Sequence, residues 1–232
     1  ALSPLFSARG AESPVVLLSG DSPVAQLGHG AFQELEQPDM SARVTKASFR
    51  AGADIGFDIA RAIRIARSGR PGPVHVALPF DLLNNPVADG VVPQKDRGRD
   101  ISPMEAGAAQ AVLSALAAAK RPLVLTGPML NASRAGSQVR ELADMLDAPV
   151  VPLESPRGLR DPSLGMFSDA LARADLIVSL GKSVDFTLGF GRPPAVDADC
   201  AFFVVDPDDG ESERARRLLG EHLSGVVRAD AD

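Results

Sequence analysis

Residues 174–181 read Ala-Asp-Leu-Ile-Val-Ser-Leu-Gly, a short apolar run that ends at a glycine. A run of this length and composition, bounded by turn residues, predicts a buried β-strand. The same pattern returns along the chain, and most of these runs again stop at a turn-forming residue. Further strands are predicted at residues 15–18, 74–78, 122–126, 149–153 and 201–205, with a weaker one at 43–47.

Helical spacing of apolar residues separates the predicted strands. Residues 54–68 repeat apolar side chains at helical intervals behind Asp54, which we expect to be the N-cap. Strands that are apolar throughout and alternate with helices predict an α/β fold, with parallel sheets covered by helices on both faces. Further helices are predicted from Ser102, as N-cap, to residue 120, at 134–146 with Leu142, Met145 and Leu146 facing inward, at 169–174, and in a charged C-terminal segment that includes His222.

A change of character near the middle of the chain predicts two domains. Residues 84–103 are rich in Asn, Asp, Gly and Pro and show no periodic apolar pattern, which is typical of a connector. We therefore expect one domain over residues 1–92, a linker over 93–103 and a second domain over 104–232. The chain starts at Ala1, and we expect it to be part of a longer chain.

Composition excludes several classes of function. The net charge of −6 disfavours a general nucleic-acid binder, which usually shows a basic stripe, and no Trp or Tyr is present to stack on bases. One cysteine excludes an internal disulfide and, with three scattered histidines, a Cys/His zinc pattern. Neither a signal peptide nor a membrane-spanning apolar run is visible. We expect a cytoplasmic protein that binds neither nucleic acid nor membranes.

Residues that follow the predicted strands suggest a nucleotide crevice, because ligands of open parallel sheets bind beyond the carboxyl ends of the strands. A glycine there admits a phosphate, and an acidic residue accepts ribose hydroxyls. The alternative is that the glycines only form tight turns, that the Asp before Pro starts a turn, and that the charges of Lys182 and Arg157 are solvated. The candidates are Gly127, Ser155, Arg157, Gly181, Lys182 and Asp206; the chain has no dinucleotide-binding or P-loop motif.

Candidate catalytic residues are few. His29 lies in a predicted loop, where it could act as a general acid or base. The alternative is that it is a solvated loop residue with no catalytic role. His75 lies within a predicted strand and is expected to be a core or subunit-contact residue. Cys200 has no evident histidine partner, so we expect it to be structural. We therefore assign no catalytic residue and no metal ligand to this chain.

Three segments of the first half carry a family resemblance. They are Gly-His-Gly-Ala-Phe-Gln-Glu at 28–34, Val-Thr-Lys at 44–46 and Ser-Gly-Arg-Pro-Gly-Pro-Val-His-Val-Ala-Leu-Pro at 68–79. In this order they resemble the later half of the pyrimidine-binding domain of thiamine diphosphate-dependent enzymes, in the branch of acetolactate synthase, benzoylformate decarboxylase and oxalyl-CoA decarboxylase. The second half resembles the Rossmann-like central domain of that family. Its segment 181–194 is most similar to 2-hydroxyacyl-CoA lyase and oxalyl-CoA decarboxylase.

The resemblance implies part of a lyase, decarboxylase or carboligase that uses thiamine diphosphate and Mg²⁺ and acts on 2-oxo acids or 2-hydroxyacyl substrates. No segment matches the family's catalytic glutamate or its diphosphate and Mg²⁺ motif, so the chain is expected to be inactive alone. The family's active sites lie between subunits, which implies a homodimer or homotetramer. A non-catalytic module that binds ADP, CoA or FAD is the alternative.

Residue roles implied by the resemblance concern two regions. Phe32, Gln33 and Lys46 match positions that line the substrate channel. Gly127, Ser155, Arg157, Gly181, Lys182 and Asp206 lie where relatives approach FAD, ADP or CoA. The family's glycine triplet is here Gly-Pro-Met at 127–129, and its arginine segment is Lys-Ser-Val-Asp-Phe at 182–186. Both departures weaken the case for FAD, since a proline removes an N–H donor.

Overall fold

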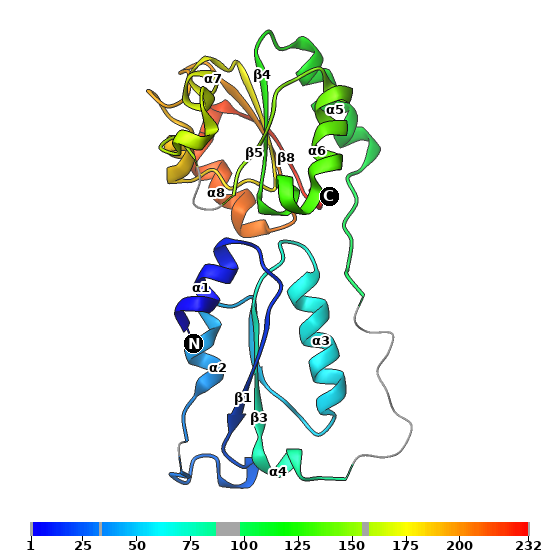
Figure 1. The fold of residues 1–232 in the computed structure, drawn as a ribbon, viewed down its shortest axis with the longest axis vertical. Helices are drawn as coiled ribbons and strands as arrows, with labels where there is room; N and C mark the ends of the chain where they lie inside the picture. Colours follow the sequence, from blue (N-terminus) through cyan, green and yellow to red (C-terminus); the bar gives the residue numbers. More distant parts are fainter. Residues whose placement is uncertain (1, 33, 87–97, 155–157, 232) are drawn as a thin grey trace. The chain divides into compact units, whose positions relative to one another are not determined.

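The computed structural model describes residues 2–32, 34–86, 98–154 and 158–231, and these form two compact units. The first unit comprises Ala1–Asp100 and the second Ile101–Asp232. Figure 1 shows that each unit is a sheet with helices packed on both faces. The predicted α/β class is confirmed. Among the described residues, no helix is long and apolar enough to cross a membrane.

The first unit is built on a three-stranded parallel sheet in the order β1-β3-β2. Helix α3 covers one face with alanines and isoleucines that pack on the valines of β3, while α1 and α2 lie on the other face (Figure 1). The bounds are β1 Val16–Asp21, β2 Ala47–Arg50, β3 Val74–Pro79, α1 Leu2–Gly10, α2 Gln37–Ala42, α3 Ile55–Arg67 and α4 Phe80–Leu83, with a 3₁₀ turn η1 at Val24–Gln26.

The second unit is a doubly wound five-stranded parallel sheet in the order β5-β4-β6-β7-β8. Helices α5 and α6 cover one face and α7 and α8 the other (Figure 1), so that two apolar clusters enclose the central strands. The order reverses between β4 and β6, which is the switch point where such sheets bind ligands. The bounds are β4 Pro122–Thr126, β5 Val150–Pro152, β6 Leu176–Leu180, β7 Ala201–Val205, β8 Leu223–Val227, α5 Ala106–Ala118, α6 Ala132–Leu146, α7 Phe167–Arg173 and α8 Asp209–Leu219.

Two predicted elements in the first half of the sequence are corrected by backbone hydrogen bonds. The strand expected at 43–47 starts only at Ala47, because the Thr45 hydroxyl and the Val44 N–H both donate to the Ser41 carbonyl and close a turn. Ser102 is not a helix cap. Its N–H donates to the Asp230 carboxylate at 2.7 Å and its carbonyl accepts from the Asp230 N–H, and Glu105 stands at the N-cap position of α5.

Two further corrections concern helix faces and the C-terminus. Leu142 and Leu146 pack on the core, whereas Met145 is 77% exposed, because it is rotated from Leu146 by about 100° around the helix axis. His222 is exposed in a short 3₁₀ turn, Gly220–His222, and not in a helix. Helix α8 ends before Gly220, which has a φ of +53°, and the chain continues as strand β8.

Candidate functional site

The second unit has a pocket of about 650 Å³ beyond the carboxyl ends of β5 and β6. One wall is the segment 158–161 after β5, and the other is the 3₁₀ turn η4, Phe186–Gly191, after β6. The two walls touch through backbone, since the Leu159 N–H donates to the Thr187 carbonyl at 2.9 Å. A Cβ on Gly158 would lie 2.2 Å from that same oxygen, so this approach requires glycine.

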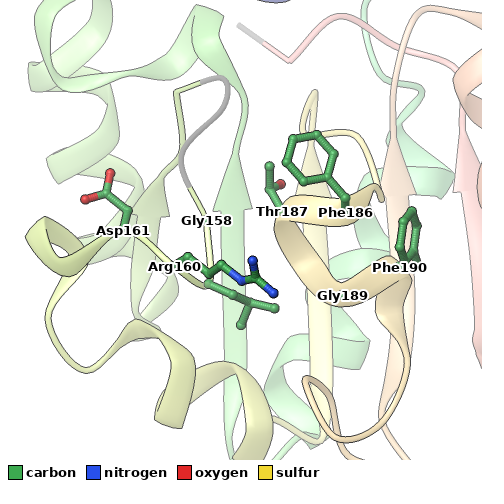
Figure 2. Close-up of a pocket in the computed structure, with 8 residues that line it drawn as sticks. Gly158, Arg160, Asp161, Phe186, Thr187, Gly189 and Phe190 are labelled. Atoms are coloured by element: carbon green, nitrogen blue, oxygen red, sulfur yellow. The ribbon is translucent and has the colours of Figure 1, made fainter.

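The side chains of this pocket combine aromatic rings with a cation. Phe186 is 63% exposed and Phe190 49% exposed, and both project from the same turn. Figure 2 shows the Arg160 side chain reaching toward this turn, while the Asp161 carboxylate points away from it. Phe190 has a φ of +58°, a strained value for a residue with a Cβ. Exposed rings and a guanidinium suit a planar ligand that carries an anion.

Lys182 and Asp185 hold the η4 turn in place from beneath. The Asp185 carboxylate accepts from the Thr187 N–H at 2.9 Å, from the Thr187 hydroxyl, and from the Lys182 ammonium at 3.3 Å. Lys182 is 6% exposed and also donates to the Ser183 carbonyl at 3.0 Å. The alternative that Lys182 is a solvated charge is therefore wrong, because its ammonium is buried against a carboxylate.

The two glycines at the switch point contact each other. The Gly127 N–H donates to the Leu180 carbonyl at 2.9 Å, and a Cβ on Gly127 would lie 2.1 Å from the Gly181 carbonyl oxygen. Gly181 has a φ of +65°, which favours glycine by itself. The close approach of the ends of β4 and β6 accounts for Gly127, and the positive φ accounts for Gly181, so neither glycine requires a phosphate.

The remaining nucleotide candidates differ in what the structure describes. Asp206 is 1% exposed, and its carboxylate accepts from the Asp208 N–H at 2.9 Å, which makes it a turn-forming group after β7. Ser155 and Arg157 lie outside the described residues. The structure thus brings Lys182 next to the pocket but does not expose Asp206 to a ligand.

A second pocket, of about 520 Å³, lies in the first unit beyond the carboxyl ends of β1 and β3. Phe32 is 87% exposed and lines it together with Gln37 and Asp21. The Asp21 carboxylate accepts from Arg50 Nε at 2.6 Å and from the Ser22 N–H at 2.9 Å, so its charge is balanced. The other lining residues are Gly20, Ser22, Pro23, Gln26, Leu78, Phe80 and Leu83.

Two carboxylates hold the loop that carries Phe32. Glu34 accepts from the backbone N–H groups of Gly28, Gly30 and Ala31, the last two at 2.9 Å. Asp81 accepts from the Val24 N–H at 3.1 Å at the start of the same loop. These backbone hydrogen bonds hold the pKa of both carboxyl groups below the usual value, because they favour the charged form.

Lys46 lies away from Phe32 within the first unit. Its N–H donates to the Pro73 carbonyl at the amino end of β3, and its ammonium donates to the Ile65 and Ser68 carbonyls at 2.6 and 2.5 Å, at the C-terminus of α3. Parallel strands put the amino and carboxyl ends at opposite edges of the sheet. The structure therefore does not bring Lys46 and Phe32 into one pocket of this unit, and Gln33 lies outside the described residues.

The other predicted titratable residues have plain environments. His75 is 1% exposed and hydrogen-bonds through both ring nitrogens, and burial lowers the pKa of its imidazole. Burial raises the pKa of the Cys200 thiol to about 12. His29 is exposed in its loop. His75 is thus a satisfied core residue and Cys200 an unreactive one, as predicted.

Sequence reasoning missed Gln37, Glu34 and Arg160. Gln37 and Glu34 belong to a Gln- and Glu-rich run, residues 33–37, which resembles any solvated surface. The one signal in the sequence is that Glu34 follows Gly28 and Gly30 by six and four residues, a spacing at which a carboxylate can accept hydrogen bonds from the backbone N–H groups of a glycine-rich loop.

Comparisons with known proteins place the chain among thiamine-dependent enzymes. Residues 109–222 match the family described as thiamine pyrophosphate enzyme, central domain. The chain is 30% identical to a 2-hydroxyacyl-CoA lyase of Arabidopsis thaliana over 222 residues, covering 89% of this chain and 39% of the relative. It is 28% identical to an oxalyl-CoA decarboxylase of Escherichia coli, covering 92% and 41% respectively. It is 32% identical to an acetolactate synthase of Mycobacterium leprae, covering 97% and 39%. The chain thus spans about two fifths of the length of these relatives.

Proposed function

From the premise that this chain belongs to the family of thiamine diphosphate-dependent enzymes, we propose that it is part of a lyase or decarboxylase that acts on a 2-hydroxyacyl-CoA or 2-oxo acid substrate. The observation that carries this is the agreement of one chain with three relatives of related activity over both of its units. A non-catalytic nucleotide-binding module is not favoured, since the relatives are enzymes by name.

The cofactor implied by the family is thiamine diphosphate, which supplies a carbanion that adds to a carbonyl group and then stores its electrons. Among the described residues, no group of three or more Asp, Glu, His or Cys side chains is placed to hold a metal ion. The described residues therefore do not fit a Mg²⁺-diphosphate site, and we route no step through this cofactor. What this chain contributes in the proposal is an exposed Phe32 loop that contacts substrate and excludes water.

Turnover by the complete gene product tests the proposal. The protein, expressed from the whole open reading frame with thiamine diphosphate and Mg²⁺ added, is expected to release an aldehyde from a 2-hydroxyacyl-CoA or CO₂ from a 2-oxo acid. Phe32→Ala should reduce kcat/KM. Phe6→Ala, at another exposed phenylalanine on α1, is the matched control and should leave kcat/KM unchanged. Absence of turnover with both substrate classes, in protein that retains bound cofactor, would reject the proposal.

We further propose that the pocket of the second unit binds the adenine nucleotide part of CoA or ADP. Phe186 and Phe190 supply ring surfaces, and Arg160 supplies a cation for a phosphate. Lys182 acts here by positioning the η4 turn through Asp185. The buried Asp206 is not required in this arrangement.

Calorimetric titration of the 232-residue chain with ADP, CoA and adenosine tests this second site. Arg160→Gln should weaken ADP about tenfold and leave adenosine unchanged, because the lost bonds are charge-assisted. Arg140→Gln on the exposed side of α6 is the control. Equal ADP affinities for both variants and the unsubstituted chain would exclude Arg160 as a phosphate contact. The oligomeric form and the cytoplasmic location expected from the sequence stay predictions.

A further inference from the structure

Beneath the pocket of the first unit, four side chains form a continuous hydrogen-bonded chain. Ser48 Oγ lies 2.8 Å from His75 Nδ1, and His75 Nε2 lies 2.8 Å from Ser19 Oγ. Ser19 Oγ lies 2.7 Å from Gln37 Oε1, and Gln37 Nε2 lies 2.8 Å from the Gly20 carbonyl. The chain joins all three strands of the sheet to the first residue of α2.

The direction of every bond in this chain follows from its last member. Only the amide nitrogen of Gln37 can donate to the Gly20 carbonyl, so Gln37 Oε1 accepts the single hydrogen of the Ser19 hydroxyl. His75 must then donate from Nε2 to Ser19. Its Nδ1 is the acceptor of a neutral imidazole and takes the hydrogen of Ser48. The bonds therefore run one way, from Ser48 to Gly20, and prevent the Gln37 amide from turning over.

This orientation matters because Gln37 lines the pocket beside Phe32. One of its two amide N–H groups is bound to Gly20, which leaves the second available as a donor at the pocket wall. The same wall carries the apolar side chains of Leu78, Phe80 and Leu83 beside the polar Ser22 and Gln26, and the Asp21 charge is balanced by Arg50. A fixed neutral donor beside apolar side chains suits a carbonyl oxygen of a ligand that also carries an apolar chain. It suits a ligand with a second carboxylate poorly, because neither the neutral donor nor the apolar side chains would balance the added charge.

We propose that the Gln37 amide donates a hydrogen bond to the 2-oxo oxygen of a 2-oxo acid that carries an apolar chain. In this proposal Ser19, His75 and Ser48 hold the Gln37 amide in position. This inference rests on the proposed enzyme function and deepens it, because it assigns the substrate side chain to the pocket of the first unit. If these hydrogen bonds only stabilised the fold, substitutions in them would leave the ligand affinity unchanged.

Nuclear magnetic resonance on the 232-residue chain tests both parts. With ¹⁵N-labelled histidine at pH 7.5, His75 is expected as the Nε2–H tautomer. In titrations, 2-oxohexanoate should bind more tightly than pyruvate or oxalate. Gln37→Leu should weaken 2-oxohexanoate roughly five- to tenfold, as expected for one lost hydrogen bond. Gln110→Leu on α5 is the matched control.

A pair of substitutions at Ser19 separates positioning from folding. Ser19→Thr retains the hydroxyl and should bind 2-oxohexanoate like the unsubstituted chain, whereas Ser19→Ala should bind it more weakly. An Nδ1–H tautomer would overturn the assigned direction. Equal affinity of Gln37→Leu and Gln110→Leu, or no binding of 2-oxohexanoate at all, would overturn the contact. Neither result bears on turnover of the complete protein, so failure of this inference is distinguishable from failure of the proposed function.

Discussion

Gly127→Ala separates packing from phosphate binding at the switch point of the second unit. The added Cβ would lie 2.1 Å from the Gly181 carbonyl oxygen and 2.6 Å from its carbon. Both are backbone atoms, so no side chain can turn away, and one strand end must move by roughly 1 Å to reach an ordinary contact. That movement also lengthens the 2.9 Å hydrogen bond from Gly127 to Leu180. Overpacking and a weakened hydrogen bond together predict a loss of about 2–4 kcal/mol in the free energy of unfolding.

Urea unfolding without any ligand measures this loss. The chain has neither Trp nor Tyr, so circular dichroism is the suitable signal. Gly107→Ala in the first turn of α5 is the matched control, because a Cβ there meets nothing within 4 Å and should not destabilise the chain. If Gly127→Ala unfolds within about 0.5 kcal/mol of the unsubstituted chain, the packing explanation is refuted and a ligand must account for the glycine.

Three further predictions concern single side chains. The Cys200 thiol, with a pKa of about 12, should resist alkylation at pH 8 in the folded chain and react at once in urea. Burial lowers the pKa of His75 below 6.5, so the unfolded chain binds more protons just below that pH. The free energy of unfolding should therefore fall as the pH drops from about 6.5, and His75→Asn should flatten this slope in urea titrations. Lys46→Met removes two hydrogen bonds from the C-terminus of α3, and calorimetry should show a loss of up to about 1 kcal/mol, whereas no loss would mean that the ammonium is only solvated.

Strands buried on both faces could be predicted from the sequence almost to the residue. Strands β4 and β7 coincide with the apolar runs at 122–126 and 201–205, because a central parallel strand has no solvent face to interrupt the pattern. Strand β8 could not be predicted in the same way. It is an edge strand in which Ser224 and Gly225 interrupt the apolar residues, so it shows neither a continuous apolar run nor a regular alternation.

The candidate sites were less predictable, because they depend on contacts between distant segments. The sequence around Gly127 does not show that this residue faces Gly181. From the sequence alone, a tight turn and a phosphate contact are therefore both open as explanations of this glycine. Gln37 had no local signal, since its role comes from Ser19 and His75 on two other elements. Lys46 follows a family motif, yet its ammonium is bound at the opposite sheet edge from Phe32.

The layer between α2 and the first sheet has a thermodynamic consequence. The buried residue of α2 is a serine, Ser41, and the sheet face that it covers carries Ser19, Ser48 and His75. This layer is therefore held together mainly by hydrogen bonds and buries little apolar surface. Release of α2 would expose chiefly polar surface, which lowers the heat capacity where apolar surface raises it. This layer should therefore contribute little to the curvature of the stability curve, and α2 should detach with a nearly constant enthalpy across temperature, unlike the alanine- and valine-packed face under α3.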